Sequence, residues 1–310
     1  MSEHETRRRF LQATGGLTLV ALAGCLGDDG DGSDDGMNDA MDDGGMDDDG
    51  MNDGGMDDSG MDDGGTDDGD GMDDGDEMEA EPTTFTVRIE NIAPTEFYSP
   101  GSSTGGAIWI TPGAYAVHSG ENPVYTAGEA ASIGLEALAE AGPPTGFEGE
   151  PGLVDELDGA MGVASVGAYT PDDTVADPND PMGEVPDAPP IAPGGAFEFE
   201  IEAEPGQRLS FASMFVPSND VFFSPGPDGI ALFEDGSPVE GAVTDSVGLW
   251  DAGTEPNTEP PGTGPDQAPA QESPDQGADE EGVVRRLDAV DDGFDYPDAG
   301  DAIQVTVTPE

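Results

Sequence analysis

The stretch LSFASMFVPSND, residues 209–220, decides the fold of this chain. In an extended strand its odd-numbered positions share one face and its even-numbered positions share the other, and neither face carries a charge up to position 216. This pattern predicts a β-strand that is covered on both sides. Pro217 ends the strand because proline has no N–H for the ladder, and the chain then presents Asp220.

A second strand of the same kind leads into a second acidic loop. The sequence VGLWDAGTE, residues 247–255, starts apolar and then places Asp251 and Glu255 four residues apart. Gly253 permits a tight turn between them. Three carboxylates that leave the ends of buried strands suggest a hard cation, and calcium takes 6–8 oxygen ligands. The alternative is that these acids simply face solvent, because the chain has 70 of them.

Several separate blocks of the chain resemble the spondin N-terminal domain family, which occurs in extracellular matrix proteins and in prokaryotic secreted proteins. The two central motifs are SMFVPSND at 213–220 and DAGTE at 251–255. The flanking blocks are FTVRIENIAP at 85–94, GEAASIGLEALAEAG at 128–142 and DQAPAQESPDQGADEEGVVR at 266–285. Together they extend over roughly residues 83–310.

The resemblance implies a fold, a metal and a set of ligands. The family's domain is a β-sandwich that resembles a C2 domain, and its animal members bind calcium. The family's ligands map onto Asp220, Asp251 and Glu255, with a fourth glutamate that falls on Glu200. Glu255 stands where the animal proteins carry aspartate, so its longer side chain departs from the family pattern.

Hydrophobic alternation elsewhere predicts more strands in residues 83–310. Apolar residues alternate with polar ones at 85–89, 197–202 and 302–308, and a more apolar strand is expected at 107–111. Residues 128–140 have helical spacing and end at Gly142 and Pro143. The expected architecture is mostly β, an antiparallel β-sandwich with one short helix and long loops.

Two segments between these elements, 171–195 and 256–281, are rich in proline, glycine and acids. Their composition alone is typical of disordered inserts. The resemblance implies instead that at least the second segment is ordered and wraps the acidic site.

The first 25 residues have the features of a targeting segment. TRRRFLQ at 6–12 has the form of a twin-arginine export signal, and the apolar run at 17–23 is too short to span a bilayer. LAGC at 22–25 looks like a lipobox, so we expect Cys25 to carry a lipid. Cys25 is the only cysteine of the chain, which rules out an intrachain disulfide.

Residues 26–82 repeat Gly-Met-Asp-Asp-Gly with small variations and contain 25 acids and no basic residue. Such a segment cannot bury enough apolar surface to offset its ordering entropy, so we expect a disordered tether. Two alternatives are a calcium-loop mimic, since Asp-x-Asp-Gly recurs, and a soft-metal site built from its methionines. The first lacks the flanking helices of an EF-hand, and the second lacks any histidine or thiol beside the methionines.

The formal net charge of −63 restricts both habitat and partners. Self-repulsion of this size opposes compaction in ordinary salt, whereas at about 1 M salt the Debye length is only about 3 Å. The composition therefore predicts a halophile. It excludes nucleic acid, which needs basic patches, and electrostatic docking on anionic lipid.

Histidine and cysteine usage excludes several enzyme classes. Only His118 remains once His4 leaves with the signal, so neither a serine or cysteine triad of the usual kind nor a zinc site of several imidazoles or thiolates can be built. A blue-copper site needs two histidines and a cysteine. We expect His118 to be a structural residue.

These observations predict a non-enzymatic protein: a lipid-anchored, cell-surface domain that binds calcium and meets an extracellular protein or a glycan. Membrane attachment would come from the lipid on Cys25. One alternative is an extracellular hydrolase that uses Glu200 and Glu255 as acid and base. Another is a passive polyanionic surface component.

Overall fold

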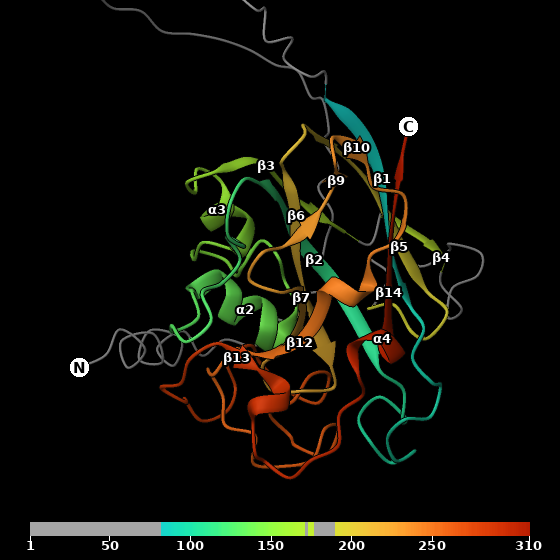
Figure 1. Ribbon diagram of the computed structural model, residues 1–310. Coiled ribbons are helices and arrows are strands. Elements are labelled where there is room, and N and C mark those ends of the chain that lie inside the picture. Colours follow the sequence, from blue (N-terminus) through green and yellow to red (C-terminus); the bar gives the residue numbers. More distant parts are fainter. Residues whose placement is uncertain (1–81, 171–172, 177–189) are drawn as a thin grey trace, which may run out of the picture. The chain divides into compact units, whose positions relative to one another are not determined.

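A computed structural model describes residues 82–170, 173–176 and 190–310. The predicted export signal, the lipidation of Cys25 and the acidic tether up to residue 81 lie outside the described residues. The described part is mostly β and contains two antiparallel sheets that face each other as a sandwich, as predicted (Figure 1).

The first sheet has five strands in the order β11-β14-β1-β5-β4. Their bounds are β11 Gly241–Ala242, β14 Ile303–Pro309, β1 Thr83–Asn91, β5 Ala196–Ala203 and β4 Thr174–Ala176. The predicted alternation is confirmed, because every second residue of β1, β5 and β14 is buried in the space between the sheets. The outward residues of β5 are the three glutamates 198, 200 and 202.

The second sheet has the order β13-β12-β7-β6-β2-β3, and β8 also pairs with β6. The bounds are β13 Arg285–Arg286, β12 Val247–Asp251, β7 Val221–Pro225, β6 Arg208–Val216, β2 Trp109–His118, β3 Val163–Tyr169 and β8 Ile230–Ala231. A separate two-stranded hairpin joins β9 Phe233–Glu234 to β10 Ser237–Pro238.

Strand β6 lies in the middle of the second sheet and is buried on both sides from position 209 to position 216. Phe211 and Phe215 on one face join the core between the two sheets. Ala212 on the other face packs in a second apolar cluster with Leu135 and Leu138 of the helix that covers the sheet. The prediction of a strand covered on both sides is therefore confirmed.

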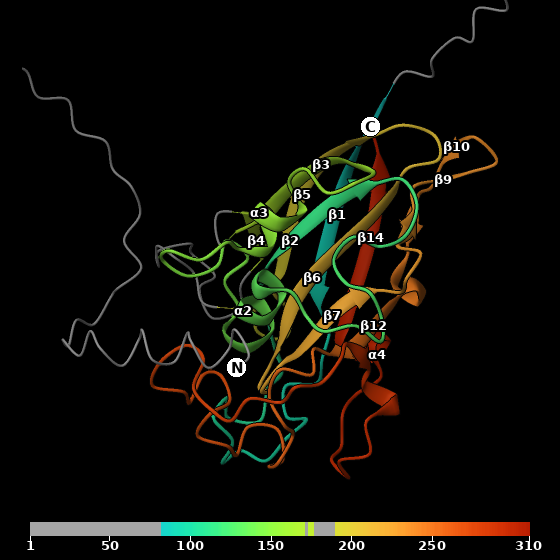
Figure 2. The same cartoon turned by 90° about the vertical axis from the view of Figure 1, so that its left-hand side faces the viewer.

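Three α-helices accompany the sheets in the described residues, where the sequence predicted one. Helix α2, Ile133–Ala141, begins later than predicted because Ser132 caps it by accepting a hydrogen bond from Leu135 N, and Gly142 ends it at φ 94°. Helices α3, Leu153–Leu157, and α4, Ala299–Ala302, are additional. Figure 2 shows α2 and α3 on the outer side of the second sheet. Within the described part of the chain, no helix has the length and apolar character to cross a membrane.

Strand β2 continues well past its predicted end at Thr111. The sequence Pro112-Gly113 is typical of a turn, but in the structure the strand continues through it and the pairing of β2 with β6 shifts register there. A Cβ at Gly113 would overlap the backbone of Ala212 and the ring of Tyr169, so only glycine permits this close approach.

The long segment 256–281 has no helix or strand, but it is tied to the body at several points. Ser103 N donates to Gly262 O at 2.8 Å, Gln271 Nε2 donates to Glu140 O at 3.3 Å, and Glu280 N donates to Thr254 O at 2.6 Å. The segment thereby covers the end of the second sheet at which β6 and β12 end.

Candidate metal centre

Two neighbouring strand ends bring Asp220 and Asp251 together. Asp220 directly precedes β7, and Asp251 is the last residue of β12 and pairs with Val221 of β7. Ala252 N continues the ladder by donating to Asp220 O at 3.1 Å. Both aspartate side chains are fully buried.

The turn after β12 folds around the carboxylate of Asp220. Oδ2 of Asp220 accepts from Thr254 N at 2.8 Å and from Glu255 N at 3.2 Å. Gly253, at φ 70°, makes this turn possible, because a Cβ there would lie 2.5 Å from Val283 N. The predicted role of Gly253 is confirmed, and Glu255 is carried into the interior with only 3% of its surface exposed.

Each of the three carboxylates keeps one buried oxygen without a hydrogen-bond partner: Oδ1 of Asp220, Oδ1 of Asp251 and Oε1 of Glu255. Of these, only Oδ1 of Asp251 has an ion pair, with Arg285 Nε at 3.0 Å. The other oxygens do have partners. Asn257 Nδ2 donates to Asp251 Oδ2 at 2.8 Å, and Asn219 Nδ2 lies 3.5 Å from Glu255 Oε2. A buried polar atom without a partner costs about 1–3 kcal/mol, more when it is charged, so three in one place require a physical explanation.

Burial and mutual repulsion shift the titration of these acids. Burial raises the pKa of Glu255 to about 8, and the charge of Asp220 adds to the shift. Burial also raises the pKa of Asp220, followed by the charge of Asp251. For Asp251 burial again raises the pKa, and Arg285 acts in the opposite direction. All three carboxylates are therefore harder to ionise here than in water, unless positive charge is supplied.

A second acidic group lies beside the first and was missed by sequence reasoning. One carboxylate oxygen each of Glu136, Glu140 and Asp275 lie within 4.8 Å of one another, and no other trio of acidic, histidine or cysteine side chains in the described ranges is so compact. The predicted trio of Asp220, Asp251 and Glu255 is thus the looser of the two groups. The sequence does contain one sign of this group, because Glu136 and Glu140 are four residues apart and therefore lie on one face of the predicted helix.

Glu200 is not part of either group, which corrects the predicted ligand set. It lies on β5 in the opposite sheet, paired with Thr86, and its side chain is exposed. The short turn 204–207 joins β5 to the start of β6, whereas Asp220 follows the end of β6. Phe199, next to Glu200, stacks on Tyr115, which pairs with Phe211 of β6. Five further residues of strand, about 17 Å, separate Phe211 from the end of β6, so Glu200 does not reach the acidic strand ends.

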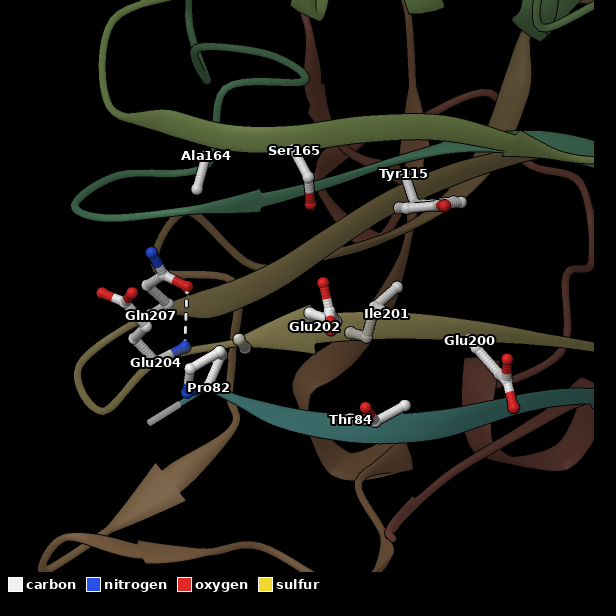
Figure 3. Close-up of a pocket in the computed structure, with 11 residues that line it drawn as sticks. Pro82, Thr84, Tyr115, Ala164, Ser165, Glu200, Ile201, Glu202, Glu204 and Gln207 are labelled. Carbon is white, nitrogen blue, oxygen red and sulfur yellow. Dashed lines mark hydrogen bonds between the residues drawn. The ribbon is translucent and has the colours of Figure 1, made fainter. Parts of the chain in front are cut away.

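Figure 3 shows the surroundings of Glu200 instead. It lines an open cavity of about 560 Å³ with Thr84 of β1, Tyr115 of β2 and Ser165 of β3. No other predicted ligand lines this cavity. A shared role for Glu200 and Glu255 as catalytic acid and base is excluded by the same separation.

His118 has the environment of a structural residue. It is buried at the end of β2 that pairs with Arg208, and its Nε2 lies 2.8 Å from Ser210 Oγ. Burial lowers its pKa to about 4, with a further contribution from Arg208. The imidazole is therefore neutral at neutral pH.

Comparison with known proteins adds no relative. No protein-family model matches the chain, and no curated protein matches it. The spondin resemblance, and the calcium site and partner that it implies, remain predictions.

Proposed function

We propose that this chain is a lipid-anchored, cell-surface domain of a halophile that binds calcium at Asp220, Asp251 and Glu255. One observation carries the metal assignment: the buried Oδ1 of Asp220 and Oε1 of Glu255 have no hydrogen-bond partner, and Oδ1 of Asp251 has only an ion pair with Arg285. Buried charged oxygens are normally paired or coordinate a metal, so a cation among them is the simplest compensation.

The donor set supports a hard cation. The three groups offer only carboxylate oxygens, and the side chains of Asn219, Asn257 and Thr254 donate hydrogen bonds to them. Calcium takes 6–8 such ligands in flexible geometry, whereas zinc and copper sites use nitrogen and sulfur. His118 lies at the other end of β6 and Cys25 in the proposed anchor, so neither supplies a softer ligand.

A bound cation would stabilise the loops rather than perform a reaction. It would neutralise the repulsion between β7 and β12 where they end and hold the 251–255 turn beneath segment 256–281. We propose that these fixed loops contact an extracellular protein or a glycan, as the spondin resemblance suggests; this part of the proposal rests on analogy alone. The twin-arginine motif and Cys25 support export and anchoring, and the net charge of −63 supports a halophile and argues against nucleic acid.

The raised pKa of Glu255 favours a second candidate, a hydrolase that uses carboxylic acids. A catalytic acid must reach its substrate. A cavity of about 530 Å³ lies beside Asp251, but the residues that line it do not include Glu255, Asp220 or Asp251. The binding function is therefore the better supported proposal. If no metal site exists, the remaining interpretation is a passive polyanionic surface component.

Thermal unfolding at fixed high salt tests the proposal. Calcium at 100 times its dissociation constant adds about 2.7 kcal/mol to stability, a shift of several degrees for a domain of this size. Asp251→Ala should make the difference between calcium and chelator clearly smaller, whatever it does to the midpoint in chelator. Asp245→Asn, at an exposed acid before β12, should keep it. No calcium shift in the unmodified protein would refute the metal site.

A further inference from the structure

We propose that Glu136, Glu140 and Asp275 hold a second divalent cation, of the calcium type, next to the first, with Glu255 facing both. The inference extends the proposed function and rests on it in one respect, because Glu255 lies between the two proposed cations. The second site itself stands on its own geometry.

The spacing of the three oxygens fits a calcium ion. Because the oxygens lie within 4.8 Å of one another, a point exists that is no more than about 2.8 Å from all three. Calcium–oxygen distances are about 2.3–2.6 Å, so only a small contraction of the trio is needed. Magnesium needs about 2.0–2.1 Å and near-octahedral geometry, which would require a larger rearrangement.

Burial makes this trio unlike a surface cluster. Glu136 is 8% exposed and Glu140 is 4% exposed, although both belong to α2, whose apolar residues pack on the second sheet. Like charges four residues apart on a helix are unfavourable even in water. In a buried position the repulsion is larger, because the effective dielectric constant is lower.

The unpartnered oxygen of Glu255 that supports the first site also points to a ligand at this position. Glu255 is 3% exposed, its Oε1 has no hydrogen-bond partner, and it exerts the largest charge effect on Glu140. Asp275 acts in turn on Glu255. Oε1 faces the backbone at Gly277, since a Cβ there would overlap it. An unsatisfied buried oxygen is therefore aimed at the loop that carries Asp275.

Thr254 connects the two acidic groups. Its backbone N–H and its hydroxyl both contact Asp220 Oδ2. The same hydroxyl lies near the carboxyl of Glu140 and lowers its pKa. The groups thus lie on either side of one short turn. Two cations here would share a framework of carboxylates, with α2, β7, β12 and segment 256–281 each supplying ligands.

A shared proton is the competing explanation for the trio, and the raised pKa of Glu140, about 9, is compatible with it. The two explanations differ in stoichiometry. A proton held between carboxyl groups needs no metal, whereas the proposal requires two bound cations per chain. Counting bound calcium therefore decides between them.

The experiment is isothermal titration of the purified full chain with calcium in molar potassium chloride, which suppresses loose binding to surface acids. We expect two tight sites in the unmodified protein. The Glu140→Gln variant should keep one of these sites. If it does not fold, Glu136→Gln tests the same site. Asp251→Ala should also leave one, and Glu129→Gln, at an exposed acid before α2, should leave two.

The outcomes separate the two proposals. If the unmodified protein binds one calcium ion, and Glu140→Gln keeps this site while Asp251→Ala removes it, the second site is overturned and the proposed function is supported. If the protein binds one calcium ion, and Asp251→Ala keeps this site while Glu140→Gln removes it, the second site is supported and the first is refuted. No tight site in the unmodified protein overturns both. Two sites, each removed by its own variant, support both.

Discussion

Arg285 Nε lies 3.0 Å from Asp251 Oδ1, yet neither atom is part of a hydrogen bond. The contact is a close ion pair, and the guanidinium lowers the pKa of Asp251 against the effect of burial. Arg285 NH2 also donates to Glu280 Oε1 at 3.1 Å, and the guanidinium side chain is 33% exposed. An arginine thus supplies positive charge at the edge of the acidic group, beside the position proposed for calcium.

Replacing this arginine should tighten calcium binding. In Arg285→Gln a competing positive charge leaves Asp251, and a partly exposed ion pair contributes up to about 1 kcal/mol, so we expect about threefold to fivefold higher affinity. In chelator the variant should be less stable, because Asp251 stays buried with less compensation. Titration calorimetry and thermal unfolding measure the two effects separately.

Arg286→Gln is the matched control, because Arg286 lies over the ring of Trp250 and pairs with Asp288 rather than with the acidic group. Its calcium affinity should stay unchanged. Weaker binding in Arg285→Gln would show that the arginine organises the site instead of competing for it.

Gly277→Ala should weaken calcium binding. Gly277 has φ 140°, and a methyl group there would displace the carboxylate of Glu255 from its present position. We expect a loss of about tenfold or more in affinity at the first site, since Glu255 is proposed as a ligand there. Calorimetry in high salt measures it.

Gly293→Ala provides the control for backbone strain. Gly293 also has positive φ, 79°, but a Cβ there meets no atom within 4 Å. This variant should lose about 1 kcal/mol of stability and no calcium affinity. Equal losses of affinity in both variants would refute a specific contact between Gly277 and Glu255.

The sequence predicts the strands well because their signal is local. The uncharged faces of residues 209–216 require cover on both sides, and the structure supplies it from the facing sheet and from α2. The acids at the strand ends could also be predicted from a local pattern. Asp220 and Asp251 follow apolar runs, and neighbouring strand ends of one sheet meet at one edge.

The remaining features depend on contacts that no local pattern reveals. Glu200 has the expected alternation for a strand but lies in the other sheet, which only topology decides. Asp275 reaches Glu136 and Glu140 from a segment without regular structure. In a chain with 70 acids, burial alone distinguishes these carboxylates, and burial follows from the tertiary fold.

Without calcium, stability should fall as pH rises from 6.5 to 9. Glu255 and Glu140 have pKa values raised to about 8 and about 9, above the value of 4.5 for the free side chain. The unfolded chain has already lost these protons in this range, so ionisation in the folded state removes stability. His118 acts only below 6.5, because its pKa is lowered to about 4. Melting curves in chelator at fixed salt measure the slope.

Calcium should reduce this slope, because it binds the ionised carboxylates and its stabilisation grows as they lose protons. Glu255→Gln should make the slope in chelator shallower, since one titrating group is removed. Glu259→Gln, at an exposed acid of the neighbouring segment, should leave it unchanged. A slope that is equal in all three proteins would mean that surface charge, not the buried group, sets the pH dependence.

The proposed anchor makes a prediction about the cell. Cys25→Ser should move the protein from the membrane fraction to the medium, because each buried CH₂ of a lipid contributes about 0.8 kcal/mol of membrane affinity and the protein's own charge opposes contact with anionic lipid. Replacing both Arg7 and Arg8 by lysine should instead keep it inside the cell, because the export motif is lost. Fractionation and metabolic lipid labelling measure both effects. Membrane retention of Cys25→Ser would refute anchoring through this cysteine, since the remaining chain has a net charge near −63 and would need another attachment.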